Sequence, residues 1–170
     1  MQADFQTALR LLASHEGGWS NRSKDADPGG KTMYGITQDT YNDWCDQKGK
    51  PRGEVRHIAY AEAAAIYRAN YANPIRYEDL PPGIGYAVFD LAVNAGVSKA
   101  VHLLQEMLHI RQDGIVSSQT LAAVRAANLP DLIKRYCAAR RKWQLRRKNA
   151  KKNPGWVTRI NDVERDALRM

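Results

Sequence analysis

Apolar side chains recur at helical spacing near the start of the chain. Residues 3–16 place them on one face of a helix, namely Phe5, Ala8, Leu9, Leu11 and Leu12. The glycine pair at 17–18 is expected to end this helix, so that Glu16 lies at its carboxyl end. Between residues 19 and 36 the helical period is lost and turn-forming residues gather, which predicts a loop or a small β-ribbon.

Helical spacing returns after this segment and continues to the end of the chain. Thr37 is expected to cap a helix that runs through Trp44. A further helix is expected over residues 59–72. The most apolar stretch, residues 84–95, predicts a buried central helix that Gly96 closes.

Four more helices are expected beyond the central one. Capping or first-turn residues mark their starts: Ser98, Ser117 or Ser118, Pro130 and Pro154. The third of them is long and basic and reaches about Arg147. This succession predicts an all-α protein, mainly helical, with a ribbon or loop near residues 19–36.

Composition narrows the class of protein and its partners. The chain has 170 residues, a mean hydropathy of -0.58 and no apolar run that approaches the roughly 18 residues of a membrane span. A net charge of +8 indicates an anionic partner, which could be nucleic acid, a lipid headgroup surface or an acidic polymer. Residues 1–6 lack the features of a secretory signal, so we expect the protein to stay in the cytoplasm or to leave it with help. Cys45 and Cys137 have no zinc-site spacing, and two buried thiols are favoured over a disulfide.

Glu16 stands where a general acid for glycosidic cleavage could work. Such cleavage needs an acid that protonates the leaving oxygen, and a carboxylate or a held water on the other side of the sugar ring. The negative end of a helix dipole disfavours an ionised glutamate, and Trp19 or Tyr34 could desolvate it, so the pKa of Glu16 is expected to rise. The alternative is a solvated glutamate before a Gly-Gly helix end.

The run from Glu16 to Thr37 carries the most specific motif. It reads Glu-Gly-Gly-Trp from residue 16, then Asn21, Asp-Pro-Gly-Gly-Lys-Thr from residue 27 and Gly-Ile-Thr from residue 35. This run resembles the opening motif of glycoside hydrolase family 108, with a longer link between Asn21 and Asp27. The resemblance implies that Glu16 is the catalytic acid.

The same order of groups is similar to the phage-type lysozymes, in which an aspartate and a threonine help to position water. This similarity implies a lysozyme-like fold and makes Asp27 and Thr32 candidates for that role, with Thr37 as a rival to Thr32. The alternatives are structural. Asp27 can accept backbone hydrogen bonds within its own turn, and the threonines can be a ribbon residue and a helix cap.

The resemblance extends downstream. Residues 83–96 are similar to the central helix of family 108. Leu104-Gln105 and the run Asp113–Leu121 are similar to a segment described in the family as a predicted peptidoglycan-binding region, with Ser117 in place of its second glycine. These helices could equally be a second lobe that completes the cleft.

The resemblance implies a catalytic lobe over residues 1–80 and a helical lobe over residues 81–170, packed as one globular unit.

The basic stretch at 140–152 fits a solvated helix face, or electrostatic steering toward an anionic wall.

Four residues are candidates for contact with the sugar chain. Asp90 and Asn94 are four apart on the apolar central helix and share one of its faces. If buried, they need hydrogen-bond partners, which either a sugar cleft or a structural network can supply. Tyr34 and Trp19 can stack on sugar rings, although aromatic residues at such spacings also serve as core.

Taken with the resemblance, these residues predict a lysozyme-type N-acetylmuramidase that cleaves the β-1,4 bond between N-acetylmuramic acid and N-acetylglucosamine, as a phage or prophage endolysin. A non-catalytic cell-wall or nucleic-acid binding module and a lytic transglycosylase are the alternatives. No metal or other cofactor is implied. The expected partners are peptidoglycan and a holin or dedicated exporter that gives access to the periplasm or wall. No specific nucleic acid and no membrane span are expected, and the protein is expected to be a monomer.

Overall fold

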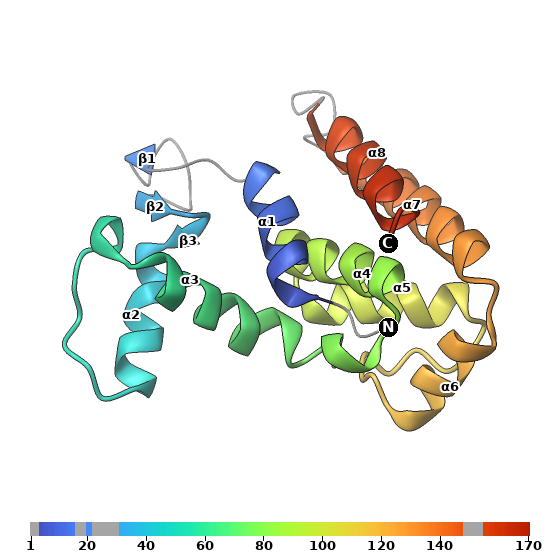
Figure 1. Ribbon diagram of the computed structural model, residues 1–170, viewed down its shortest axis with the longest axis horizontal. Coiled ribbons are helices and arrows are strands. Elements are labelled where there is room, and N and C mark those ends of the chain that lie inside the picture. The colour runs from blue at the N-terminus through green and yellow to red at the C-terminus, as the bar shows by residue number, and fades with distance from the viewer. Residues whose placement is uncertain (1–3, 16–19, 22–30, 148–154) are drawn as a thin grey trace. The chain divides into compact units, whose positions relative to one another are not determined.

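The computed structural model describes residues 4–15, 20–21, 31–147 and 155–170. Within these ranges the chain forms eight α-helices, and its extended structure is a three-stranded antiparallel sheet (Figure 1). The predicted fold, mainly helical with a small ribbon, is confirmed. None of the helices in the described ranges is long and apolar enough to cross a bilayer.

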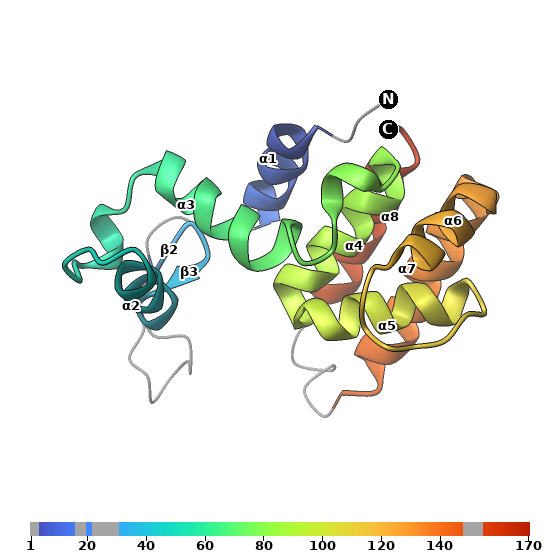
Figure 2. The ribbon, with the colours of Figure 1, turned by 90° about the horizontal axis from the view of Figure 1, so that it is seen from below.

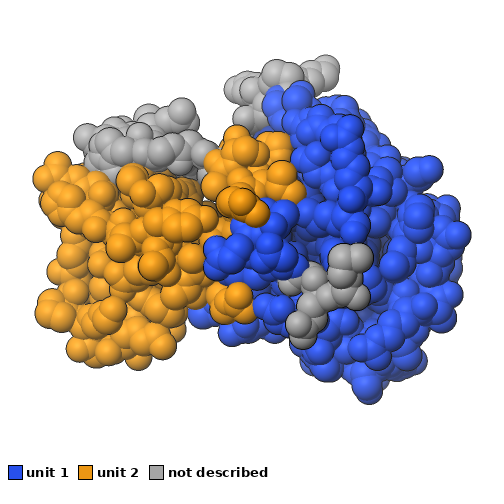
Figure 3. All heavy atoms as spheres, in the orientation of Figure 1, with its two compact units in different colours: residues 1–8, 69–170 blue, residues 9–68 orange. Residues whose placement is uncertain are grey.

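Contacts divide the chain into two compact units, coloured separately in Figure 3. Unit 1 comprises residues 1–8 and 69–170, and unit 2 comprises residues 9–68. The lobes expected at 1–80 and 81–170 stay a prediction.

Unit 1 is a bundle of helices around α4. Figure 2 shows the helices of this bundle together, and three of them pack directly against α4. The helices are α4 (Pro82–Ala95), α5 (Val97–Met107), α6 (Ser118–Ala126), α7 (Leu129–Leu145) and α8 (Gly155–Ala167).

The central helix α4 is apolar on nearly all sides, and residues 83–92 are buried. At Gly83 the helix α8 comes so close that a Cβ atom would overlap the carbonyl group of Ala167. Phe5, at the start of α1 (Phe5–His15), meets the rings of Tyr77 and Phe89 edge-on at 6.0 and 5.6 Å. The predicted buried central helix is therefore the core of unit 1.

Two of the helix starts predicted in unit 1 are confirmed. The Ser117 hydroxyl caps α6 by accepting a hydrogen bond from the backbone N–H of Thr120 at 3.3 Å, and Pro130 lies in the first turn of α7. The cap predicted at Ser98 is wrong. Gly96, with φ of 92°, ends α4 and also provides the N-cap of α5, so that Ser98 falls inside the first turn. Pro154 lies outside the described residues.

Unit 2 combines the small sheet with two complete helices and with residues 9–15 of α1. Thr37 caps α2, as predicted, and the helix expected over 59–72 is α-helical only as far as Tyr67. It continues as a π-helical turn over Arg68–Ala72, where hydrogen bonds reach one residue further. Besides residues 9–15 of α1, the elements of unit 2 are β1 (Ser20–Asn21), β2 (Lys31–Met33), β3 (Ile36–Thr37), α2 (Gln38–Gln47), a 3-10 turn (Val55–His57) and α3 (Tyr60–Tyr67).

Both cysteines are buried free thiols, which confirms the favoured expectation. Cys45 lies on α2 in unit 2 and Cys137 on α7 in unit 1. Burial raises the pKa of Cys137 to about 12.

Candidate active site

The hairpin of strands β2 and β3 carries three of the predicted site residues. Tyr34 and Gly35 form its turn, with φ of 53° and 75°. Positive φ at both central residues is typical of the type I′ turn, whose twist matches that of the flanking strands. Thr32 lies directly opposite Thr37, so the two side chains are on the same face of the sheet.

The two threonines differ in what their hydroxyls do. The Thr37 oxygen accepts a hydrogen bond from the backbone N–H of Thr40 at 3.1 Å and lies 2.9 Å from the Thr40 hydroxyl. Thr37 therefore has the structural role of a helix cap. Thr32 is half-buried, and its hydroxyl bonds to no other residue in the ranges that the structure describes. Of the pair, Thr32 is the better placed to hold a water molecule.

Three predicted residues, Glu16, Trp19 and Asp27, lie outside the described residues. The sequence places Glu16 directly after His15, the last residue of α1. The roles of these three residues stay predictions.

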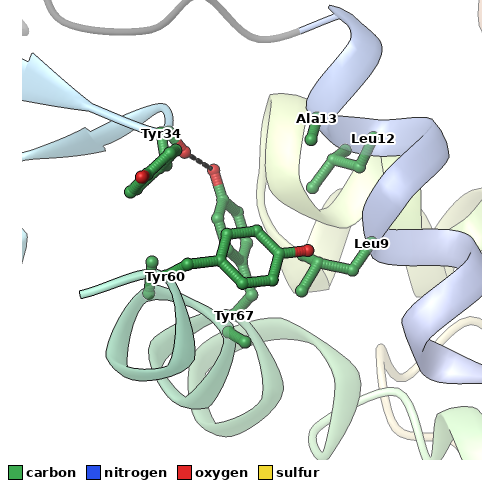
Figure 4. A pocket seen from close by; sticks show the side chains of 8 residues that line it. Leu9, Leu12, Ala13, Tyr34, Tyr60 and Tyr67 are labelled. Atoms are coloured by element: carbon green, nitrogen blue, oxygen red, sulfur yellow. Dashed lines mark hydrogen bonds between the residues drawn. The ribbon is translucent and has the colours of Figure 1, made fainter.

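An apolar pocket lies in unit 2 between α1 and α3, with the hairpin turn beside it (Figure 4). Its free space, including the open mouth, is about 270 Å³. The lining residues come from these three elements: Leu9, Leu12, Ala13, Tyr34, Tyr60, Ala63, Ala64 and Tyr67.

The spacing of residues on α3 creates this pocket. Tyr60 and Tyr67 are seven apart and share a helix face, and the small side chains of Ala63 and Ala64 lie between them. The Tyr67 hydroxyl donates to the Tyr34 carbonyl at 2.7 Å, which holds the hairpin turn. The Tyr60 and Tyr34 rings meet edge-on at 5.7 Å.

Sequence reasoning named Tyr34 as a site residue but missed Tyr60 and Tyr67. The signal was present in the pattern of aromatic and small residues along residues 60–67. The pocket suits a small apolar group, such as a methyl, against aromatic faces. Among the described residues, no cluster of three His, Cys, Asp or Glu side chains could hold a metal ion.

Asp90 and Asn94 lie on α4 in unit 1. The Asp90 carboxylate has no exposed surface, and it pairs with Arg140 at 2.7 Å and with Arg159 at 2.9 Å. This burial favours the structural network over contact with a sugar. Asn94 is half-buried, and its side-chain oxygen accepts a hydrogen bond from Gln144 at 3.2 Å.

The two arginines control the charge of Asp90. Burial alone would raise the pKa of this carboxyl, because it penalises the ionised form. The positive charges of Arg140 and Arg159 outweigh that effect and hold the pKa of Asp90 below its usual value. Asp90 is therefore ionised at neutral pH and fixed between α7 and α8.

The downstream motif of α5 and α6 also has a structural role. The Gln105 amide donates to the Asp113 carboxylate at 2.7 Å and to the Ile115 carbonyl at 3.1 Å, and its oxygen accepts from the backbone N–H of Gly114 at 2.9 Å. The Thr120 hydroxyl donates to the same Ile115 carbonyl at 3.3 Å. These residues hold the loop between α5 and α6.

Comparison with known proteins identifies the family. A family model described as Glycosyl hydrolase 108 matches residues 9–96. The chain belongs to glycosyl hydrolase family 108. A second model, described as Predicted Peptidoglycan domain, matches residues 99–161 of this family 108 protein.

A solved structure titled "Structure of Brucella abortus SagA" is similar to this family 108 chain, with a TM-score of 0.84 and 34% sequence identity. The alignment covers 97% of this chain and 94% of that chain. No curated protein sequence gives a significant match. With its two matched regions, the protein is a glycoside hydrolase that acts on peptidoglycan.

Proposed function

We propose that this family 108 protein is an N-acetylmuramidase that cleaves the β-1,4 bond between N-acetylmuramic acid and N-acetylglucosamine. The observation that carries the proposal is the family match over residues 9–96, which includes the whole motif from Glu16 to Thr37. A second support is that the described helix α1 ends at His15, the residue before Glu16 in the sequence, because the dipole of a helix disfavours a carboxylate next to its carboxyl end. A phage or prophage role, with access through a holin or exporter, stays a prediction.

In the proposed reaction Glu16 donates its proton to the leaving glycosidic oxygen. A water attacks the sugar carbon from the opposite face. The Thr32 hydroxyl and the Asp27 carboxylate orient that water, and the Asp27 carboxylate accepts the proton that it loses. Attack by a held water inverts the configuration at the sugar carbon. The apolar pocket beside α1 would accept the methyl of an N-acetyl group.

Replacing the acid tests its role. We expect Glu16→Gln to slow the clearing of purified Gram-negative sacculi by at least about 100-fold, because a general acid typically contributes that much. Glu54→Gln is the matched control, since Glu54 is exposed and forms a surface ion pair with Arg56 in unit 2. Equal clearing by the parent and Glu16→Gln would show that Glu16 is not the acid. No clearing by either protein would favour a binding module.

The released fragments decide the reaction type. Hydrolysis leaves reducing ends on N-acetylmuramic acid, whereas a lytic transglycosylase leaves anhydro-muramyl ends. Mass spectrometry of the fragments distinguishes the two products.

A further inference from the structure

Stacked cations and indole rings link three helices of unit 1. The Lys99 ammonium on α5 lies 5.0 Å from the centre of the Trp143 ring on α7. The guanidinium carbon of Arg147, just past the end of α7, lies 5.3 Å from the same ring and 5.0 Å from the ring of Trp156 on α8. We call Lys99, Trp143, Arg147 and Trp156 the cation–indole ladder. All four fall in the region 99–161 that matches the Predicted Peptidoglycan domain.

The cations of this ladder differ from neighbouring arginines in what they contact. Other arginines on α7 and α8 have carboxylate partners, among them Arg135, Arg141 and Arg159. Lys99 and Arg147 have none among the residues that the structure describes. An aromatic face holds a cation in place and leaves its charge uncompensated, whereas a carboxylate partner compensates that charge. The ladder is therefore a positive surface that is ordered before any ligand arrives.

The motif of Gln105, Asp113 and Thr120 in this region does not offer an equivalent surface. Gln105, Asp113 and Thr120 bond to one another and to the loop between α5 and α6. Their polar groups are occupied within the fold. A ligand of this region has to be recognised by other residues, and the ladder supplies charged and aromatic groups together.

We propose that the cation–indole ladder binds the free carboxylates of the peptide stems of peptidoglycan. The inference rests on the proposed function, because it assigns a docking surface for the same polymer that the active site cleaves. Guanidinium and ammonium groups form charge-assisted hydrogen bonds with carboxylates. Because the indole rings restrict Lys99 and Arg147 beforehand, less side-chain entropy is lost on binding.

Binding is measured by co-sedimentation with purified sacculi, with Glu16→Gln as the starting protein so that the sacculi stay intact. We expect Arg147→Gln to weaken binding about tenfold, the size of effect seen when an interface arginine is lost. Lys134→Gln removes one charge from an exposed position on α7 and is the matched control. If Lys134→Gln weakens binding as much as Arg147→Gln, net charge explains the effect and the ladder has no specific role.

A variant that keeps both cations tests whether their stacking on the indole rings, and not their charge alone, contributes to binding. Trp143→Leu leaves both cations in place but removes the ring that they stack on, and we expect it to weaken binding several-fold. Thermal unfolding followed by circular dichroism shows whether the variant is folded. If it is not, Lys99→Gln takes its place, with Lys134→Gln again as the control. Unchanged binding by the folded Trp143→Leu variant would overturn the proposal.

The chemistry of the partner is tested on the sacculi. Amidation of their free carboxyl groups should abolish ladder-dependent binding. Equal binding to amidated and untreated sacculi would overturn the proposal, as would tighter binding to duplex DNA or to anionic phospholipid vesicles at the same salt concentration.

A parallel assay of the parent distinguishes the two proposals. If the parent releases muramyl reducing ends while the ladder variants bind like Glu16→Gln alone, the ladder inference fails and the muramidase survives. If binding depends on the ladder but the parent releases no fragments, the muramidase fails and the docking surface stands.

Discussion

At the scale of single residues, two alanines give the pocket beside α1 its space. Ala63 is buried and Ala64 half-buried, and both line the pocket between Tyr60 and Tyr67. A larger side chain at residue 64 would occupy the volume that we assign to an N-acetyl methyl.

We therefore expect Ala64→Leu to raise the KM for peptidoglycan fragments about tenfold, the usual size of discrimination for one methyl group in an apolar pocket. Ala61→Leu is the control, because Ala61 is exposed on the same helix. Steady-state kinetics on soluble fragments measures the effect. If both variants have the KM of the parent, the pocket does not contact substrate.

Asp90 contributes to stability and not to the pocket, because its charge stabilises the interior of unit 1. Asp90→Asn would leave Arg140, which is 1% exposed, without its ion-pair partner. Removing one member of a buried ion pair costs about 3–5 kcal/mol. We expect this loss in the free energy of unfolding, measured with urea, and little change for Asp131→Asn, whose ion pair with Arg135 is exposed.

The same carboxylate makes stability depend on pH. Because folding lowers the pKa of Asp90, its contribution is present above the unfolded value near pH 4 and is lost as pH falls through the folded pKa. In Asp90→Asn this part of the acid dependence should disappear. An identical acid unfolding curve for parent and variant would contradict the assignment.

At the scale of elements, the closest helix contact in unit 1 depends on a glycine. A Cβ at Gly83 would overlap the Ala167 carbonyl and lie 2.9 Å from Cδ1 of Ile133, so α4 would have to move away from α8. We expect Gly83→Ala to destabilise the protein by about 1–3 kcal/mol, the usual cost of overpacking.

Gly85→Ala is the matched control on the same helix. A Cβ there would meet Leu80 at 3.4 Å, an ordinary contact, and alanine favours a helix over glycine by up to about 1 kcal/mol. Its Tm should therefore equal or exceed that of the parent. If the Tm of Gly83→Ala also equals or exceeds that of the parent, α4 and α8 do not pack this closely in solution.

The helices themselves were predictable to a useful degree from local chemistry. Thr37 and Ser117 cap helices as expected, because a side-chain oxygen before a helix satisfies a free backbone N–H. The cap expected at Ser98 fails because Gly96 starts α5 two residues earlier. The π-helical turn after Tyr67 has no comparable local signal.

At the scale of the whole molecule, sequence periodicity predicted the helical class and the buried central helix, since both follow from apolar spacing along the chain. Sequence periodicity did not predict which residues contact each other when they lie far apart along the chain. The pairing of Asp90 with Arg140 and Arg159 joins residues 50 and more positions apart, and the stacking of Lys99 on Trp143 joins residues 44 positions apart. In the candidate active site, sequence predicted the hairpin and its threonines but not the tyrosine pocket, which depends on how α1 and α3 pack.

The position of α4 bears on how this protein can change over evolution. The glycosyl hydrolase match ends at residue 96, yet α4, its last helix, is the element on which α5, α7 and α8 pack. A gene rearrangement that moved residues 99–161 alone would carry those helices away from their apolar partner. Because the two matched regions share this packing, we expect that they cannot be exchanged as independent modules.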